Sequence, residues 1–414
     1  MTREDFALIH RYWSTVTIGR RLARILPLSP TTLVRPADED LALPEKRLRV
    51  GILFGGRSAE HEVSLRSAQS IMQAMDRAKY ELVPIGVSKA GEWLRLDSNA
   101  LEGSAQTLIL QGERVALLPH PEDQSLVPLD NGAGVAAGPQ KPLDVVFPVM
   151  HGPLGEDGTV QGLLELADIA YVGSGVLGSA VGMDKAAMKA LFLQRRLNIT
   201  PYRVFLRKHW QNDAQAVQAE CEAAFAYPWF VKPANLGSSV GISKVHDASE
   251  LGPAMDEAAR YDRKLVVEKA VAHVREIEVS VMGNDEPAAS VVGEILPSHE
   301  FYDYESKYLD KATRLIIPAD LPESVANRVR EIAVEAFLAL DCAGLARVDF
   351  LIDGETLEIY LSEVNTMPGF TTVSMYPKLW EASGIPYPEL IDKLIELAIE
   401  RHAEIRSNRR SFAE

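Results

Sequence analysis

Several features that mark large protein classes are missing from this chain of 414 residues. No apolar run approaches the roughly 18–20 residues that a membrane-spanning helix needs. Only two cysteines are present, Cys221 and Cys342, and they lack metal-ligand spacing. We therefore expect them to be core residues rather than a disulfide or a zinc site, which is typical of a protein of the reducing cytoplasm.

Basic residues are also fewer than acidic ones. Lys and Arg number 43 against 58 Asp and Glu, which gives a formal net charge of -15 at pH 7. Nucleic acids and anionic membranes call for basic surfaces, so this balance argues against either as the main partner. Hydrophobic residues make up 47% and charged residues 24%, which is ordinary for a globular chain of two or three domains.

Two familiar nucleotide-binding motifs are absent or incomplete. No G-x-x-x-x-G-K-[ST] loop occurs. GSGVLG at 173–178 matches G-x-G-x-x-G after the strand-like IAYVG, but the region about 20 positions later, NITPYRVFL, offers no acidic residue for a ribose. We expect these glycines to permit close helix–sheet packing, so any nucleotide must be bound in another way.

Apolar strands alternating with helices predict an α/β domain over residues 48–173. Strands at 48–56, 81–88 and 143–152, with a helix at 64–75, favour a parallel sheet covered by helices on both faces. Ligands of such sheets bind beyond the carboxyl ends of the strands, where Glu60 and His151 lie.

Two further sections follow. Residues 174–267 contain a predicted helix at 185–195 and a strand at 229–234. Residues 268–402 are richer in strand and contain two predicted helices, at 323–340 and 387–402. Residues 403–414 are expected to be a tail.

Residues 1–47 stand apart from this pattern. They combine arginines at positions 20, 21 and 24 with four prolines between 27 and 44, and they lack the long apolar centre of a secretory signal. We expect an extension outside the main fold. An upstream start codon, a transit-like arm or an oligomer contact are the alternatives.

Acidic residues on the last two predicted strands are the main chemical signal. Strict alternation places Glu363 and Asn365 on one face, together with Leu361. A hairpin turn centred near residue 356 puts Asp349 opposite Glu363, whereas a tight turn at 353–354 pairs it with Glu358. Two carboxylates that close repel, and Mg²⁺, which takes oxygen ligands, would relieve the repulsion. Without a cation, the pair would be part of a solvated hairpin.

A glycine- and serine-rich loop, NLGSSVG at 235–241, follows Lys232 at a strand end. Backbone amides of such a loop can hold phosphates and a nearby lysine adds charge, although many such loops are simple turns. Along KLVVEKAV at 264–271, backbone groups near Lys269 and Val271 could meet an adenine, with Glu268 free to meet a ribose. By itself this segment is a strand with charged ends.

Together these segments resemble the D-alanine–D-alanine ligase family of ATP-grasp enzymes. The matching segments occur in the family's order between residues 48 and about 401: GGRSAEHEVSLRSA, HGPLGEDGTVQGLLE, MDKAAMK, FVKPANLGSSVGISKV, REIEVSVMG, FYDYESKY, ARVDF and SEVNTMPGFT. The resemblance implies a mixed α/β and α+β fold. An N-terminal Rossmann-like domain (48–173) would be followed by the two ATP-grasp subdomains, central (174–267) and C-terminal with the metal site (268–402).

The resemblance also implies an activity, that of a carbon–nitrogen ligase that forms ADP (EC 6.3.2.4). ATP and Mg²⁺ convert the carboxylate of a first D-alanine into an acyl phosphate, and the amine of a second D-alanine attacks it. The dipeptide serves peptidoglycan precursor synthesis, cell-wall biogenesis and cell shape. Because a carboxylate is a poor electrophile, phosphorylation supplies a leaving group, and the protein supplies positioning and charge neutralisation. The expected setting is a cytoplasmic homodimer using two Mg²⁺ ions, with Mn²⁺ as a substitute.

The family's ATP and metal positions map onto three groups of residues here. The expected metal ligands are Asp349, Glu363 and Asn365, with Glu363 bridging two ions. The lysines expected at the phosphates are Lys185, Lys232 and Lys307. The residues expected at the adenosine are Glu268, Lys269, Val271 and Glu276.

Another set is expected to bind the two amino acids. Glu60 would meet the ammonium group of the first D-alanine, and His151 would contact substrate. Lys307 and Ser374 would hold the carboxylate of the second. Outside the family, Glu60 would be a helix-capping acid near Ser64, and His151 a structural histidine.

A last set of residues is expected to act on the reacting carbonyl group and to determine which acceptor is used. Arg347 and the Gly369 amide would form the oxyanion hole, and Ser238 and Tyr308 would complete a hydrogen-bond chain with Glu60. Related ligases that make D-alanyl-D-lactate typically replace this tyrosine or restructure its loop, so Tyr308 favours D-alanine over D-lactate or D-serine. Residues 301–321 are expected to form a lid that protects the acyl phosphate from water.

A non-catalytic nucleotide-binding or regulatory protein with the same fold is the alternative from a different class. The filled metal, phosphate and oxyanion positions argue against it.

Overall fold

Three β-sheets carry the part of the chain that the computed structural model describes, namely residues 47–97, 112–129, 141–296 and 314–409. Residues 47–414 form one compact unit. Lys307, Tyr308, most of the expected lid and all but the last residue of the expected N-terminal extension lie outside the described residues.

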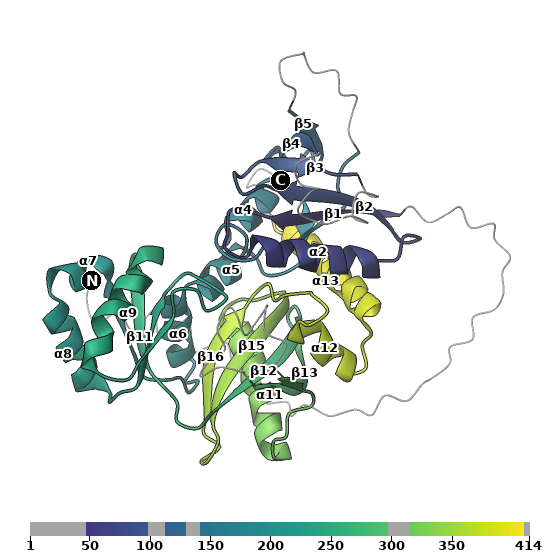
Figure 1. Cartoon of the computed structure of the whole chain (residues 1–414). Coiled ribbons are helices and arrows are strands. Elements are labelled where there is room, and N and C mark those ends of the chain that lie inside the picture. The colour runs from purple at the N-terminus through teal and green to yellow at the C-terminus, as the bar shows by residue number, and fades with distance from the viewer. Residues whose placement is uncertain (1–46, 98–111, 130–140, 297–313, 410–414) are drawn as a thin grey trace, which may run out of the picture. The chain divides into compact units, whose positions relative to one another are not determined.

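The first sheet has seven strands in the order β5-β4-β3-β2-β1-β6-β7 (Figure 1). Four strands run parallel, as predicted: β1 (Leu48–Gly55), β2 (Tyr80–Val87), β6 (Val145–Pro148) and β7 (Ala170–Tyr171). Three more extend the sheet antiparallel: β3 (Trp93–Arg95), β4 (Glu113–Leu117) and β5 (Leu126–Pro128). The expectation of a parallel sheet is therefore wrong at this edge. The link from β2 to β3 is too short for the crossover of a dozen or more residues that parallel strands need.

Helices cover both faces of this sheet. On β1, Ile52 packs with α2 (His61–Ala74) and α13 (Tyr387–Ser407), whereas the adjacent Leu53 packs on the side of α4 (Thr159–Leu166). Successive strand residues face opposite sides, so an almost wholly apolar strand is what two covered faces require. The last helix runs five residues beyond its predicted end at 402 and packs against β6 and β7 of the first sheet.

The GSGVLG glycines lie between β7 and α5 (Val176–Met183). A β-carbon on Gly178 would lie 2.5 Å from the carbonyl oxygen of Asp341, which is too close for any larger residue. Close packing, rather than dinucleotide binding, is thus the explanation that the structure supports for this motif.

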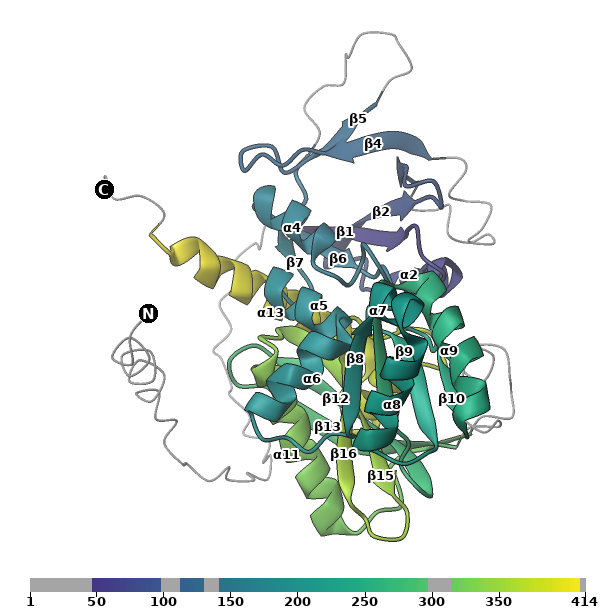
Figure 2. The same ribbon diagram turned by 90° about the vertical axis from the view of Figure 1, so that its left-hand side faces the viewer.

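The second sheet has four antiparallel strands in the order β10-β9-β11-β8. The strands are β8 (Tyr202–Leu206), β9 (Trp229–Pro233), β10 (Ser243–Val245) and β11 (Lys264–Lys269). Three helices pack beside them: α7 (Arg207–Asn212), α8 (Ala214–Ala224) and α9 (Ala248–Tyr261) (Figure 2). Val231 and Val267 point into the core with these helices, so Lys232 and Glu268, one position along each strand, face the other way.

The third sheet has five antiparallel strands in the order β14-β13-β12-β15-β16. The strands are β12 (Val274–Gly283), β13 (Ala288–Leu296), β14 (Arg314–Ile316), β15 (Gly344–Asp353) and β16 (Ile359–Asn365). Two helices cover one face, α6 (Lys185–Gln194) and α11 (Glu323–Ala339), and the short helix α12 (Met375–Ala382) packs on β12 and β13. The face opposite α6 and α11 carries the polar residues of β12 and β15.

A β-bulge corrects one expectation about β16. Asp349 pairs with Glu363, as the wider turn predicts, and the rival pairing with Glu358 is wrong. The next pair, however, is Phe350 with Leu361, so Ser362 is an extra residue. Leu361 therefore points into the core and does not share the face of Glu363, because the bulge shifts the alternation by one residue.

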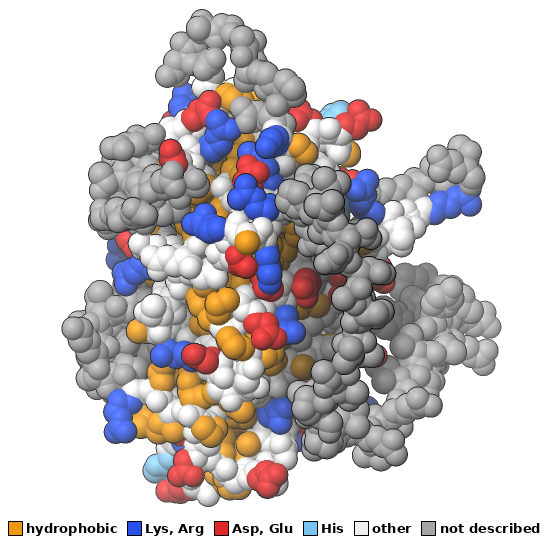
Figure 3. All heavy atoms as spheres, turned by 90° about the vertical axis from the view of Figure 1, so that its right-hand side faces the viewer, with side chains coloured by type: hydrophobic (Ala, Val, Ile, Leu, Met, Phe, Trp, Pro, Cys, Tyr) orange, Lys and Arg blue, Asp and Glu red, His pale blue; other side chains and the backbone are white. Residues whose placement is uncertain are grey.

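Acidic and basic side chains of the described residues are interspersed on the face shown in Figure 3. Within the described ranges, no helix combines the length and the apolar character that crossing a membrane would take.

Candidate active site

Two adjoining cavities, both open to solvent, share the wall formed by Gly237, Ser238, Glu278 and Glu363. The first cavity brings together eight of the expected site residues: Glu60, His151, Ser238, Arg347, Glu363, Asn365, Gly369 and Ser374. The second brings together six: Lys185, Lys232, Ser238, Glu276, Asp349 and Glu363. Residues from all three sheets thus converge on one place.

Three expected adenosine residues line neither cavity. Lys269 ends β11 and is exposed, Val271 follows it half-buried, and Glu268 is 1% exposed. Their contact with a nucleotide stays a prediction.

The carboxylates on β15 and β16 have cationic partners. Arg347 donates through Nε and Nη2 to the two oxygens of Asp349, both at 2.7 Å, and Asn365 Nδ2 donates to Asp349 Oδ2 at 2.9 Å. Lys185 Nζ lies 3.1 Å from Glu363 Oε2. These partners offset the repulsion between the two acids. The side chains of Asp349 and Glu363 stay 17% and 26% exposed, so a ligand can reach them.

The chemistry of these donors fits a hard divalent cation. Two carboxylates and an amide oxygen on neighbouring strands are the ligand type that Mg²⁺ takes, and phosphates and water usually complete its shell. Among the described residues, no group of three or more His, Cys, Asp or Glu side chains is arranged to hold a metal. The expected set contains only two such residues, Asp349 and Glu363, since its third member is Asn365.

A buried ion cluster joins β9, β11 and α6. Glu268 Oε1 contacts the Lys232 ammonium, and Glu268 Oε2 lies 2.9 Å from Lys189 Nζ and accepts a hydrogen bond from Thr200 at 3.3 Å. Burial alone would raise the pKa of Glu268, but the two ammonium groups hold it far below its usual range. Both Glu268 oxygens have partners within this cluster, and the contact of Glu268 with a ribose stays a prediction.

Lys189 was not among the sequence candidates, although a signal for it existed. It lies four residues after Lys185 in MDKAAMK, and side chains at i and i+4 share a helix face.

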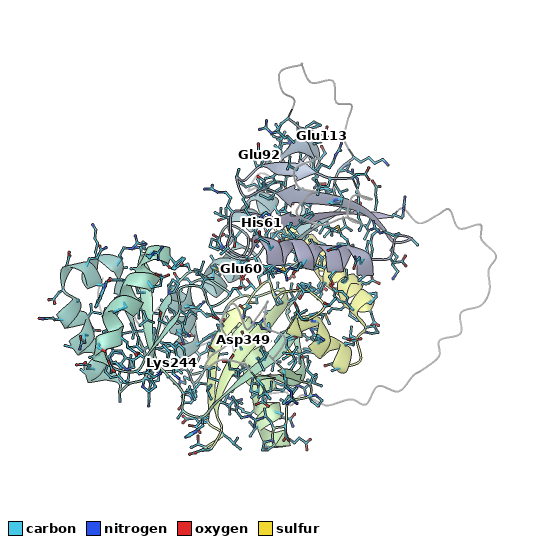
Figure 4. All side chains as sticks on the ribbon, in the orientation of Figure 1. Glu60, His61, Glu92, Glu113, Lys244 and Asp349 are labelled. Atoms are coloured by element: carbon cyan, nitrogen blue, oxygen red, sulfur yellow. The ribbon has the colours of Figure 1, made fainter. Side chains whose placement is uncertain are left out.

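Glu60 lies at the start of α2 (Figure 4), and its side chain contacts the glycine-rich loop. Its Oε1 accepts a hydrogen bond from the Ser238 hydroxyl. A β-carbon on Gly152 or on Gly237 would come within 2.9 Å of Glu60 Oε2, so two glycines make room for this carboxylate.

The helix-capping alternative for Glu60 is wrong, because its side chain caps no backbone group of α2. Ser64 makes the local contacts: it accepts from the Gly55 amide at 2.8 Å and donates to the Val149 carbonyl at 2.5 Å.

His151 follows β6 and is 4% exposed. Its Nδ1 lies 3.2 Å from Glu156 Oε1 and 3.1 Å from the Met367 carbonyl, and its Nε2 lies 3.2 Å from Ser67 Oγ. Burial opposes a charge on the ring, but the contact with Glu156 and the negative charge nearby raise the pKa of His151. Sequence reasoning missed Glu156, five positions along the same motif, and Ser67.

The loop after β16 is closely packed against the start of α12. Ser374 Oγ accepts from the Thr371 amide at 2.9 Å, and a β-carbon on Gly369 would lie 2.8 Å from the same oxygen. Arg347 Nε lies 3.1 Å from Glu278 Oε2 on β12. Arg347 and Gly369 both line the first cavity, as the expected oxyanion hole requires.

The fold and the site define an ATP-grasp ligase: a doubly covered sheet precedes two smaller sheets that present lysines and paired carboxylates to a common cavity. Two family models match the sequence, D-ala D-ala ligase N-terminus over residues 49–174 and D-ala D-ala ligase C-terminus over residues 191–396. The chain belongs to the D-alanine–D-alanine ligase family.

Individual relatives agree. The chain is 52% identical over 359 residues to the D-alanine–D-alanine ligase of Heliobacterium modesticaldum, covering 87% of this chain and 96% of that one. The solved D-alanine-D-alanine ligase from Coxiella burnetii is 35% identical, with a TM-score of 0.75 over 87% of this chain and 96% of its own. VanG D-Ala:D-Ser ligase from Enterococcus faecalis is 33% identical, also with a TM-score of 0.75, over 85% of this chain and 100% of its own.

Proposed function

We propose that this chain joins two D-alanine molecules into D-alanyl-D-alanine with ATP, through an acyl phosphate, for peptidoglycan synthesis. Given that the chain belongs to this family, one observation supports the proposal most directly. The ammonium-binding candidate Glu60, the oxyanion candidates Arg347 and Gly369, and the metal candidate Glu363 line a single cavity. That cavity adjoins a second one with the lysines suited to phosphates.

The side chains divide the work by charge. Glu60 would neutralise the ammonium group of the first amino acid and hold it beside Ser238. Lys185 and Lys232 would receive the phosphates of ATP, whose negative charge would take the place of Glu363 at Lys185 and add to that of Glu268 at Lys232. Each charged group thus gains or exchanges a partner of opposite charge, so little charge is left unpaired.

Arg347 and the Gly369 amide would stabilise the oxygen that becomes negative when the acceptor amine attacks. Both groups are positioned before the reaction, Arg347 by Asp349 and Glu278 and Gly369 by its packing on Ser374. Donors fixed in advance cost no reorganisation as the charge develops.

Asp349, Glu363 and Asn365 would hold Mg²⁺, which when bound supplies neutralisation of the phosphate charge. We propose two ions, with Glu363 between them and Mn²⁺ as an acceptable substitute. We also propose a cytoplasmic homodimer. We propose that Lys307 and Ser374 hold the carboxylate of the acceptor, and that Tyr308 completes a hydrogen-bond chain with Ser238 and Glu60.

D-Serine is the second candidate acceptor, since one similar solved structure is a D-Ala:D-Ser ligase. Several relatives named D-alanine–D-alanine ligase are nearer in sequence, at 48–52% identity against 33%. We therefore propose D-alanine as the preferred second substrate.

The test is ADP release by the purified protein with ATP, Mg²⁺ and D-alanine, with L-alanine as the control. Mass analysis of the product with D-alanine alone, and with added D-serine or D-lactate, identifies the acceptor. We expect D-alanyl-D-alanine as the main product at neutral pH. ADP release that does not depend on D-alanine would contradict the ligase assignment, and a mixed product in excess would contradict the acceptor.

A further inference from the structure

The loop that carries Gly369 is anchored mainly by the first sheet and its helices. His151 Nδ1 lies 3.1 Å from the Met367 carbonyl. Ser67 Oγ, on α2, accepts a hydrogen bond from the Phe370 amide at 3.2 Å. The Tyr387 hydroxyl, on α13, donates to the Phe370 carbonyl at 3.1 Å. These contacts cross more than 200 residues of sequence in two of the three cases.

The anchors bracket one peptide group. The Met367 carbonyl belongs to the peptide before Pro368, and the Phe370 amide belongs to the peptide after Gly369. The peptide between them, Pro368–Gly369, carries the Gly369 N–H. Since proline has no N–H, the peptide before it can be anchored only through the Met367 oxygen. His151 and Ser67 therefore fix the groups on either side of the proposed oxyanion donor.

The direction of the hydrogen bonds follows from the partners. A backbone N–H only donates and a carbonyl only accepts, so Ser67 Oγ is the acceptor for Phe370 and His151 Nδ1 carries a hydrogen toward Met367. His151 Nε2 lies 3.2 Å from Ser67 Oγ and links the two anchors. The raised pKa of His151 is in keeping with a ring that donates from both nitrogens.

Packing makes this arrangement rigid. Ser67 and Phe370 are both fully buried. The Phe370 ring meets Phe147 edge-on, with centroids 5.5 Å apart, and also lies against Tyr376 and Tyr387. A buried amide that loses its acceptor costs free energy, so the loop will shift if Ser67 loses its hydroxyl.

We propose that Ser67 and His151 are positioning residues that set the direction of the Gly369 N–H, so that the first sheet and α2 control the oxyanion hole. The inference rests on the proposed ligase function. Ser67, which lies on α2, would thus position the Gly369 loop through the Phe370 amide. His151 would position the same loop through the Met367 carbonyl, in addition to any contact with substrate. An oxyanion donor must lie close to the developing charge, and displacements of about 1 Å can cost on the order of 100-fold in rate.

The first experiment compares Ser67→Ala with Ser290→Ala. Ser290 is a matched control, because it is almost equally buried and its hydroxyl also accepts a backbone amide, that of Ser280 at 3.0 Å. Neither serine lines a cavity, but Ser67 holds the amide next to Gly369, whereas Ser280 is not adjacent in sequence to any cavity-lining residue. We expect kcat of Ser67→Ala to fall on the order of 100-fold with KM for ATP unchanged. A phosphinate analogue of the tetrahedral intermediate should lose affinity by the same factor. Ser290→Ala should keep its kcat.

The second experiment uses two replacements of His151 and decides the matter if Ser67→Ala does not fold. The side-chain nitrogen of asparagine takes the place of Nδ1, and that of glutamine takes the place of Nε2. His151→Asn retains the donor to Met367 and should keep a kcat at least about tenfold above that of His151→Gln, which loses it.

Three outcomes are distinguishable. A wild-type protein without D-alanine-dependent ADP release would overturn the proposed function. An active wild type with an equally active Ser67→Ala variant would overturn the positioning role of Ser67. An active wild type in which His151→Gln equals or exceeds His151→Asn would overturn the role assigned to His151.

Discussion

Each of the two ATP-grasp sheets carries a glutamate paired with lysine, but one glutamate is buried and the other is accessible to water. On the second sheet, Glu268 is 1% exposed and is bound by Lys189 and Lys232. On the third sheet, Glu363 is 26% exposed and is bound by Lys185. The carboxylate–lysine chemistry is the same, and the access of water differs.

Burial decides what each pair can do. A buried charge cannot exchange its partner for water, so the Glu268 cluster is a fixed part of the architecture. Glu363 can exchange Lys185 for a cation or a phosphate-bound ion at small cost, because water reaches it. One pair therefore holds the sheets in place, and the other is suited to chemistry.

The largest expected effect is on the accessible pair. Glu363→Gln removes the charge that would hold Mg²⁺ while keeping the shape, so we expect kcat for ADP release to fall on the order of a thousandfold. Thermal unfolding should change little. Activity within tenfold of the wild type would mean that Glu363 is not a metal ligand.

Replacing each of the two lysines of α6 should damage a different property, stability in one variant and activity in the other. Lys189→Met leaves Glu268 with one ammonium group in a buried setting, and we expect a loss of about 3 kcal/mol in the free energy of unfolding. Lys185→Met should cost only about 1 kcal/mol, since Glu363 keeps access to water. Urea unfolding measures both, and ADP release should show the opposite order of damage. Equal losses of stability would remove the distinction drawn between the two pairs.

Acid should weaken the buried pair. The pKa of Glu268 is held far below its usual range, so its stabilising contribution is complete above the unfolded value of about 4.3. That contribution is lost as the pH falls from there through the folded pKa. The free energy of unfolding should therefore decline below about pH 4.3, and Glu268→Gln should show a shallower decline than the wild type. Parallel curves for the two proteins would contradict this assignment.

The smallest effect on stability is expected at an ion pair on the surface, away from the candidate active site. Lys89 Nζ lies 2.6 Å from Glu62 Oε1, with side chains 68% and 30% exposed. Solvent screening leaves such pairs little net energy, so Lys89→Ala should change the free energy of unfolding by less than about 0.5 kcal/mol. A larger loss would show that exposure alone does not rank these pairs.

Sequence patterns were a good guide wherever periodicity or a motif carried the signal. Alternating strands and helices predicted the parallel half of the first sheet, and one of the two hairpin turns considered predicted the pairing of Asp349 with Glu363. The residues around Glu60, His151 and Arg347 came from motifs, and the structure brings them to one cavity. Their catalytic roles stay predictions.

What escaped prediction depends on contacts between distant parts of the chain. The bulge at Ser362 follows from packing Leu361 into a core formed with α6 and α11, which strand alternation cannot show. Ser67 and Lys189 look like ordinary helix residues, and only the fold brings one to Phe370 and the other to Glu268. The antiparallel edge strands, of three to five residues, were too short to stand out.

Helix α6 carries one further consequence. Lys185 contacts the third sheet, Met188 packs in its core, and Lys189 reaches the second sheet. The three attachments depend on helical phase, since each residue turns the helix by about 100°. Substitutions that keep the chemistry can be accommodated along this segment, but inserting or deleting a single residue between the two lysines would swing one of them out of reach. The amino-acid sequence of this helix can therefore vary far more readily than its length.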